Sequence, residues 1–354
     1  MASSFKPIGP SDVISTRTLL HEAIPITGTI VSGTYSDGNV KNYAHGMFQS
    51  VYDYPYLSSS ANHIFDITLG YSAQSVLSSS VIAAAQPAKK QNIYNQMAQL
   101  LAGYDVTGSI TRFSTGSATN DTKLDDAVFV SFSRLLAKDE IKKGSFQLNL
   151  GVNAAKATPF AKTTAITDNN AASSYRVDSP AGEYAVLYAT GNLNATGYQP
   201  CGLLYYQAGI AVLSSSIFTS TAHGGGLIDN ADPIQWNDAA VSFTGAVINN
   251  EISASSDALR NRIQLLQFNN TTELNSTIYF CRANHNEFNF SANPTYTSES
   301  KIAVKKQSTD TPVSYITTVG LYSADNVLLA VAKLSEPLRK DPTMEYTLRV
   351  RLDY

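Results

Sequence analysis

Charged residues are scarce in this sequence: Asp, Glu, Lys and Arg make up 15% of it, against roughly 25% in an average soluble domain. The formal net charge is −3, which excludes a general polyanion binder, because such a protein normally carries a strongly basic surface. Uncharged polar residues fill the gap, with 20 Tyr but one Trp among 354 residues. A hydrophobic fraction of 43% still allows a packed core.

Cysteines and long apolar runs are also scarce. Cys201 and Cys281 are the only two cysteines, and we predict that both are buried, reduced thiols. The sequence lacks the run of about 18 apolar residues that a membrane-spanning helix needs. No basic segment followed by an apolar one opens the chain, so we expect no signal peptide and synthesis in a reducing cytoplasm.

Most of the chain has the two-residue hydrophobic period of β-strands. A helical period appears in two places, from Lys89 to a candidate C-terminal cap at Gly103 and from Ser256 to Leu266. The sequence therefore predicts a mainly β fold of antiparallel sandwich or meander sheets with two short amphipathic helices. The predicted strands cover residues 25–35, 65–69, 128–132, 145–152, 184–190, 202–213 and 278–281.

The C-terminal residues have the most regular alternation. Strands are predicted at 315–322 and 327–334, followed by a polar reversal at 336–343 and a last strand at 346–354. Leu348, Val350, Leu352 and Tyr354 share one face of this last strand, and Thr347, Arg349, Arg351 and Asp353 share the other. We predict an antiparallel meander with one solvated face.

The length predicts two domains. Residues 153–180 are rich in Ala, Thr, Asn and Ser and show little periodicity. We therefore place a loop or linker there, between a β-rich domain with one helix (1–152) and an antiparallel β domain (181–354).

Residues 184–228 contain no Asp, Glu, Lys or Arg, yet they are rich in Tyr and Ser. Depletion of charge with enrichment of Tyr is typical of protein–protein interfaces. A fully buried central pair of strands explains the same composition equally well. The candidates on these strands are Tyr184, Tyr188, Tyr205 and Tyr206.

No catalytic motif is complete. His223 and the three glycines after it match an esterase oxyanion loop, but the chain has no Gly-x-Ser-x-Gly nucleophile motif. The five histidines are scattered without zinc spacing, and there is no phosphate-binding glycine loop. The polar segment from Arg282 to Glu287 could host a site, although a hydrogen-bonded loop is the simpler interpretation. We predict a non-enzymatic protein with no catalytic residue, cofactor, metal or specific nucleic-acid site.

Several segments resemble a virion structural protein of contractile-tailed marine phages, the cyanophage-type myoviruses. They span much of the chain and thin out between about 153 and 240: HEAIPITG and the following TIVSGTYSDGN (from His21), HGMFQSVYDYPYLSSSANHIFD (45–66), IYNQMAQLL (93–101), SRLLAKDEIKKGSF (133–146) and the closing stretch from VGLYSADN to RVRLDY. The resemblance implies a repeated component of the particle, located in the virion and most plausibly in the tail, at the baseplate or neck. Its partners would be copies of itself and other virion proteins.

Three hypotheses follow. The first is a structural subunit that assembles through uncharged, Tyr-rich interfaces, because low charge reduces the desolvation cost of burying a surface. The second is a host-binding or carbohydrate-binding module, in which Tyr52, Tyr54 and Tyr56 could stack on the sugars of a host glycan. The third is a particle-borne glycan hydrolase with dispersed carboxylates. Candidate interface residues outside 184–228 are Tyr52, Tyr54, Tyr56, Leu348, Val350 and Leu352.

Overall fold

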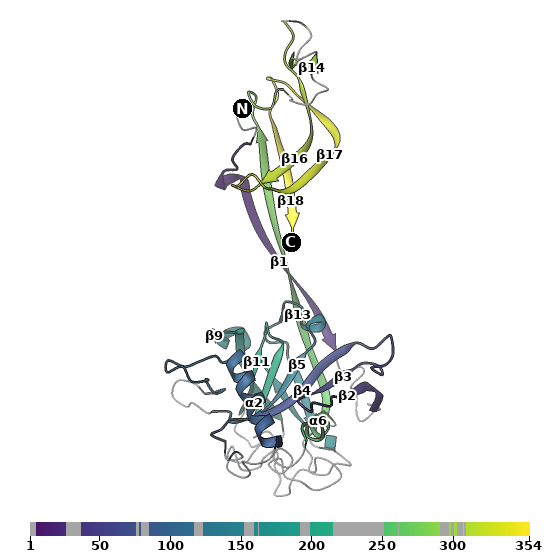
Figure 1. Ribbon diagram of the computed structural model, residues 1–354, viewed down its shortest axis with the longest axis vertical. Coiled ribbons are helices and arrows are strands. Elements are labelled where there is room, and N and C mark those ends of the chain that lie inside the picture. Colours follow the sequence, from purple (N-terminus) through teal and green to yellow (C-terminus); the bar gives the residue numbers. More distant parts are fainter. Residues whose placement is uncertain are drawn as a thin grey trace. The chain divides into compact units, whose positions relative to one another are not determined.

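The computed structural model confirms a mainly β fold (Figure 1): in the part of the chain that it describes, 51% of residues are in strands and 15% in helices. All strand pairs with a defined register are antiparallel. The structure describes residues 5–25, 37–75, 78, 85–116, 123–151, 159–161, 163–191, 199–214, 251–260, 262–290, 297–298, 301–302, 307 and 309–354. Within these residues, no helix combines the length and apolar character needed to cross a membrane.

The chain forms two compact units. Unit 1 comprises Met1–Leu19 and Glu273–Tyr354, and unit 2 comprises Leu20–Thr272. Two strands belong partly to each unit, β1 (Val13–Pro25) and β13 (Ile263–Ala283). The predicted division at 153–180 was wrong, because the strands on either side of its first part, β7 and β8, pair with each other inside unit 2.

Unit 2 is built on one sheet, in which the strand order is β13-β7-β8-β10-β11-β12-β5-β4-β3-β2. Strand β6 pairs with β13, and β9 pairs with β10. The bounds are β2 (Val40–Asn42), β3 (Gln49–Tyr52), β4 (His63–Tyr71), β5 (Asp126–Phe132), β6 (Glu140–Ile141), β7 (Gln147–Gly151), β8 (Thr163–Thr167), β9 (Arg176–Ser179), β10 (Gly182–Gly191), β11 (Gln199–Tyr205) and β12 (Ile210–Ser214).

The hydrophobic core lies in unit 2. Every residue of β12 is buried, and its neighbours β11 and β5 are buried along most of their length. This explains why the uncharged sequence around 202–213 contains no charge: a strand buried on both faces has no solvated position for one. The predicted strand 202–213 is two strands, β11 and β12, separated by a tight turn at 206–209.

Helix α2 (Ala85–Leu101) confirms the first predicted helix, and Gly103 ends it with a positive φ of 78° and an N–H bond to the Ala98 carbonyl. The helix packs against β4, where Gly70 is required: a Cβ there would lie 2.5 Å from the Lys90 carbonyl oxygen. The second predicted helix was misplaced. Helix α6 covers Ile252–Arg260, and β13 begins at Ile263. The remaining short helices of the described residues are η1 (Pro10–Asp12), η2 (Asp37–Asn39), α3 (Arg134–Ala137), η4 (Pro159–Ala161) and α4 (Ala171–Ser174).

Unit 1 holds β1 as far as Leu19 and β13 from Glu273, together with β18 (Tyr346–Asp353), which pairs with β13 over Ser276–Ala283. A separate antiparallel hairpin consists of β16 (Ser314–Tyr322) and β17 (Leu328–Lys340). The two-residue strands β14 (Thr297–Ser298) and β15 (Lys301–Ile302) also pair.

The predicted three-stranded C-terminal meander was therefore only partly right. The hairpin is confirmed, but β17 continues as far as Lys340, and β18 pairs with β13 instead of β17. Alternation is confirmed within β18: Val350 is buried and Leu348 and Leu352 are half-buried, whereas Thr347, Arg349, Arg351 and Asp353 are exposed. Tyr354, which was assigned to the same face as Val350, follows the end of the strand and is 76% exposed.

Some predictions fall on residues that the structure does not describe. The predicted strand 25–35 lies almost entirely outside the described residues, as do the His223 glycine loop and residues 192–198 and 215–228 of the uncharged region.

Candidate functional site

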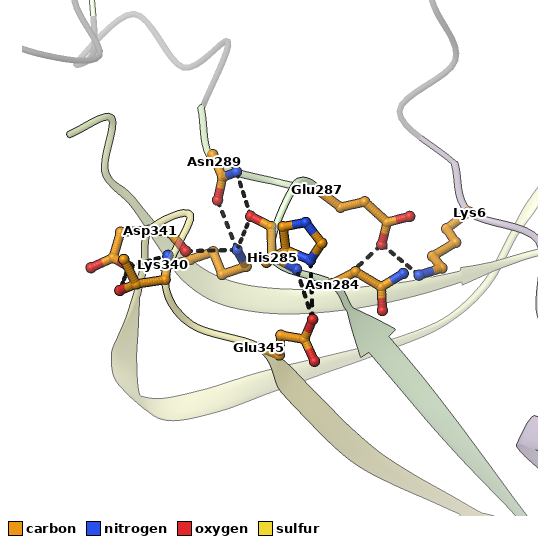
Figure 2. Close-up of polar contacts among 9 residues, drawn as sticks. Lys6, Asn284, His285, Glu287, Asn289, Lys340, Asp341 and Glu345 are labelled. Carbon is orange, nitrogen blue, oxygen red and sulfur yellow. Dashed lines mark hydrogen bonds and ion pairs between the residues drawn. The ribbon is translucent and has the colours of Figure 1, made fainter.

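The polar segment predicted after β13 forms a hydrogen-bonded loop in unit 1 (Figure 2). The Asn284 backbone N–H donates to Glu287 Oε2 at 3.1 Å, and the same oxygen is 2.5 Å from Lys6 Nζ. These hydrogen bonds, with that to Lys6 the largest effect, hold the pKa of Glu287 below its usual value. The loop is thereby attached to the N-terminal segment of the chain.

Lys340 fastens the same loop to the end of β17 (Figure 2). Its side chain is fully buried, and Nζ donates to the carbonyl oxygens of His285 (3.2 Å) and Asp341 (2.9 Å) and to Asn289 Oδ1 (2.7 Å). An ammonium group has three N–H donors, so all of them are used. This lysine is a structural clamp and has no proton or lone pair available for chemistry.

His285 and Glu345 lie in the arrangement of a histidine–carboxylate pair, as in some catalytic sites. His285 Nδ1 lies 3.2 Å from Glu345 Oε1, and both side chains are about two-thirds exposed. In nucleophilic catalysis such a pair activates a hydroxyl or thiol that is hydrogen-bonded to the imidazole. Among the described residues no hydroxyl or thiol is bonded to His285, and no three His, Cys, Asp or Glu side chains gather as a metal site. The interpretation as a hydrogen-bonded loop is confirmed.

Unit 1 differs from unit 2 in where it places its apolar side chains. Among the described residues, the contiguous core cluster lies wholly in unit 2, and the buried hydrophobic residues of unit 1 are Ala283, Leu321 and Val350. More than half of the exposed large hydrophobic residues of the described chain are in unit 1, although unit 2 is the larger. Single exposed apolar residues are ordinary, but a concentration of them in one unit is typical of an interaction surface.

The hairpin of β16 and β17 carries much of this exposed surface. Tyr322 is 44% exposed, Leu328 49%, Leu329 68% and Val331 52%. Between residues 314 and 332 Asp325 is the single charged residue. Low charge combined with exposed tyrosine and aliphatic side chains is the composition of an interface core.

The predicted interface tyrosines of the uncharged region are core residues. Tyr184, Tyr205 and Tyr206 are buried within unit 2. The ring of Tyr184 stacks on that of Tyr205 at 4.9 Å, and Tyr188 is half-buried against the same core. As contacts for another subunit Tyr184, Tyr205 and Tyr206 were therefore the wrong choice, because their surface is already covered by their own chain.

The three tyrosines of the 52–56 segment do not form one stacking platform. Tyr52 and Tyr56 pack on each other with ring centroids 6.1 Å apart, and Lys41 Nζ lies 5.7 Å from the Tyr56 ring centre. Tyr54 is 55% exposed. The hypothesis of sugar stacking therefore depends on Tyr54 rather than on all three rings.

Leu348, Val350 and Leu352 lie on the more buried face of β18, opposite the exposed arginines. Val350 is already covered by its own chain, so it could affect an interface only by holding β18 in place and not by touching another subunit.

Two features were missed at the sequence level. The first is Asp168, which is fully buried and accepts hydrogen bonds from Gly144 N (2.7 Å), Phe146 N (2.9 Å) and the Tyr206 hydroxyl (2.8 Å). The second is the exposure of apolar side chains on the β16–β17 hairpin. The low charge of residues 314–332 could have indicated it.

No protein-family model, no curated protein and no solved structure matches this chain. The functional argument therefore depends on the residues and on their arrangement.

Proposed function

We propose that this chain is a non-enzymatic structural subunit of a tailed-phage virion, made in the host cytoplasm and assembled in the tail, at the baseplate or neck. The resemblance of its segments to such a virion protein motivates the proposal. The observation that carries it is the composition of unit 1, where apolar side chains are exposed and few are buried.

A unit with so little core of its own gains stability when a neighbour covers it. Burial of apolar surface contributes about 25 cal/mol per Å², and an isolated two-stranded hairpin is marginally stable at best. The hairpin of β16 and β17 is a sheet of two strands only, and most of its residues are exposed. In a particle, adjacent subunits supply the missing cover.

The polar cluster supports a structural role as well. Lys340 uses its three donors to hold neighbouring loops, and Glu287 is bonded to Lys6 and the Asn284 amide. These groups take the place of a core in fixing the loops, and none of them is left aimed at a substrate.

The test is whether the chain is part of the particle. Phage particles purified by density gradient would be analysed by quantitative mass spectrometry, with the major capsid protein as the reference for copy number. We expect several copies per particle, retained after washing at high salt. Absence from purified particles, together with a stable monomer in the lysate, would overturn the proposal.

A further inference from the structure

One face of the β16–β17 hairpin is apolar, exposed and continuous. Gly320 is paired with Val331 and Tyr322 with Leu328, so these residues lie together on the sheet. The register shifts between Leu321 and Tyr322, and a bulge of this kind sets both Leu328 and Leu329 opposite Tyr322. Both are exposed, whereas Leu321 on the opposite face is buried.

Because Gly320 has no side chain, the ring of Tyr322 can lie over β16 at this position. A Cβ at this position would lie 2.9 Å from Tyr322 Cε2 and 3.4 Å from Leu328 Cδ1. The Tyr322 ring also contacts Phe5, with ring centroids 4.6 Å apart, and Phe5 is 45% exposed. Phe5, Tyr322, Leu328, Leu329 and Val331 thus make one apolar surface, called the hairpin face below.

Charge indicates which partner fits the hairpin face. A surface that binds a charged partner carries charges of the opposite sign. The five residues of the hairpin face, by contrast, are all uncharged. Two charges flank it along the chain. Asp325 lies in the turn and Lys333 on β17, each four residues from Leu329 and both exposed. Within the described part of the chain, neither has an ion-pair partner.

We propose that the hairpin face pairs with the same face of a second copy of this chain, around a two-fold axis close to Leu329. In such a contact each surface patch meets itself, so an uncharged centre meets an uncharged centre without repulsion. The same axis brings Asp325 of one copy toward Lys333 of the other and reciprocally. This inference rests on the proposed function and names the contact through which the subunit associates.

The first test is self-association of the full chain, measured by sedimentation equilibrium over a range of concentrations. Leu329→Asp places a carboxylate at the centre of the hairpin face. We expect the dissociation constant of the dimer to rise at least about 30-fold, because substitution of a residue that dominates the centre of an interface weakens binding by at least this factor. Leu57→Asp is the matched control, because Leu57 is 88% exposed on unit 2, and it should leave the dissociation constant unchanged.

The second test addresses the two-fold geometry. Asp325→Lys and Lys333→Asp each place like charges opposite each other and should weaken the dimer. The double variant reverses both charges and should restore wild-type association at low salt. These positions are exposed, so the variants should fold, which circular dichroism would check. Failure of the double variant to recover would contradict the two-fold arrangement.

The outcomes separate this inference from the proposed function. If the wild type and Leu329→Asp associate equally, the hairpin face is not the contact, while the proposed function stands. If the wild type is a monomer in solution and Leu329→Asp blocks incorporation into particles, a different virion protein covers the face and the inference is wrong. If the wild type enters no particle, the proposed function itself fails.

Discussion

The buried pair Asp168 and Tyr206 shows how a charged residue is held inside unit 2. Burial raises the pKa of Asp168, while hydrogen bonds from Gly144, the Tyr206 hydroxyl and Phe146 act in the opposite direction. The carboxylate ties the turn before β7 to the end of β8. The neighbouring Tyr205 is also buried, but the hydroxyl that donates to Asp168 is that of Tyr206.

Tyr206→Phe should destabilise unit 2 by about 1–3 kcal/mol, because it removes a donor from a buried carboxylate. Urea unfolding at pH 7 measures this. Tyr205→Phe is the matched control, with an expected change of at most about 0.5 kcal/mol. Equal effects of the two variants would show that the bond to Asp168 contributes nothing specific.

The polar cluster of unit 1 should weaken in acid. The pKa of Glu287 is lowered chiefly by its bond with Lys6, and that of Asp341 by the Thr343 hydroxyl. A carboxyl group with a lowered pKa stabilises the folded state above its unfolded pKa, and this contribution is lost as pH falls through the folded value. We therefore expect unit 1 to lose stability progressively below about pH 4.5.

Hydrogen exchange can locate this loss. The Asn284 amide donates to Glu287 and the Thr343 amide to Asp341. The protection factors of both should fall on acidification. In Glu287→Gln the pH dependence should disappear at Asn284 and persist at Thr343; retention at Asn284 would show that Glu287 is not its source.

Residue-scale predictions from the sequence were reliable where composition alone decides. Composition did not show whether the tyrosines of the charge-free strands lie in a core or in an interface, because a buried strand and an interface strand have the same composition. What separates them is the long-range pairing of β12 with β5 and β11, and no local pattern contains that information. The same limit hid Asp168, whose partners are about 20 to 40 residues away along the chain.

At the scale of elements, hydrophobic period predicted the strands β4, β5, β7, β10 and β16 and the helix α2. The second helix was misplaced because Leu259, Ile263 and Leu266 fit a helical period. In the structure Leu259 is helical, while Ile263 and Leu266 pair with β7. Pairing with a formed strand outweighed local period there.

The facing of β18 yields a test at this scale. Val350 is buried opposite Tyr279 of β13, while Arg349 is exposed. Val350→Asp should block folding of unit 1 or its assembly, because it buries an unpaired charge. Arg349→Ala should change unfolding free energy by at most about 0.5 kcal/mol.

Thermal unfolding and gel filtration of both β18 variants would measure the difference. Identical behaviour of the two would contradict the assigned facing of the strand.

At the scale of the whole molecule, the scarcity of charge has two separate origins. In the described part of 184–214 it accompanies a core, and in 314–332 it accompanies an exposed hairpin. The chain thus pairs a unit with a core of its own and a unit whose apolar surface remains uncovered. That division is the basis of the proposed role as a subunit completed by its neighbours.

The most direct test of this account is the mass of the full-length chain in solution, measured by sedimentation equilibrium. We expect a mass above the 38.1 kDa of one chain, rising with concentration toward twice that value. A mass of 38.1 kDa at every concentration would contradict the claim that a second copy covers unit 1.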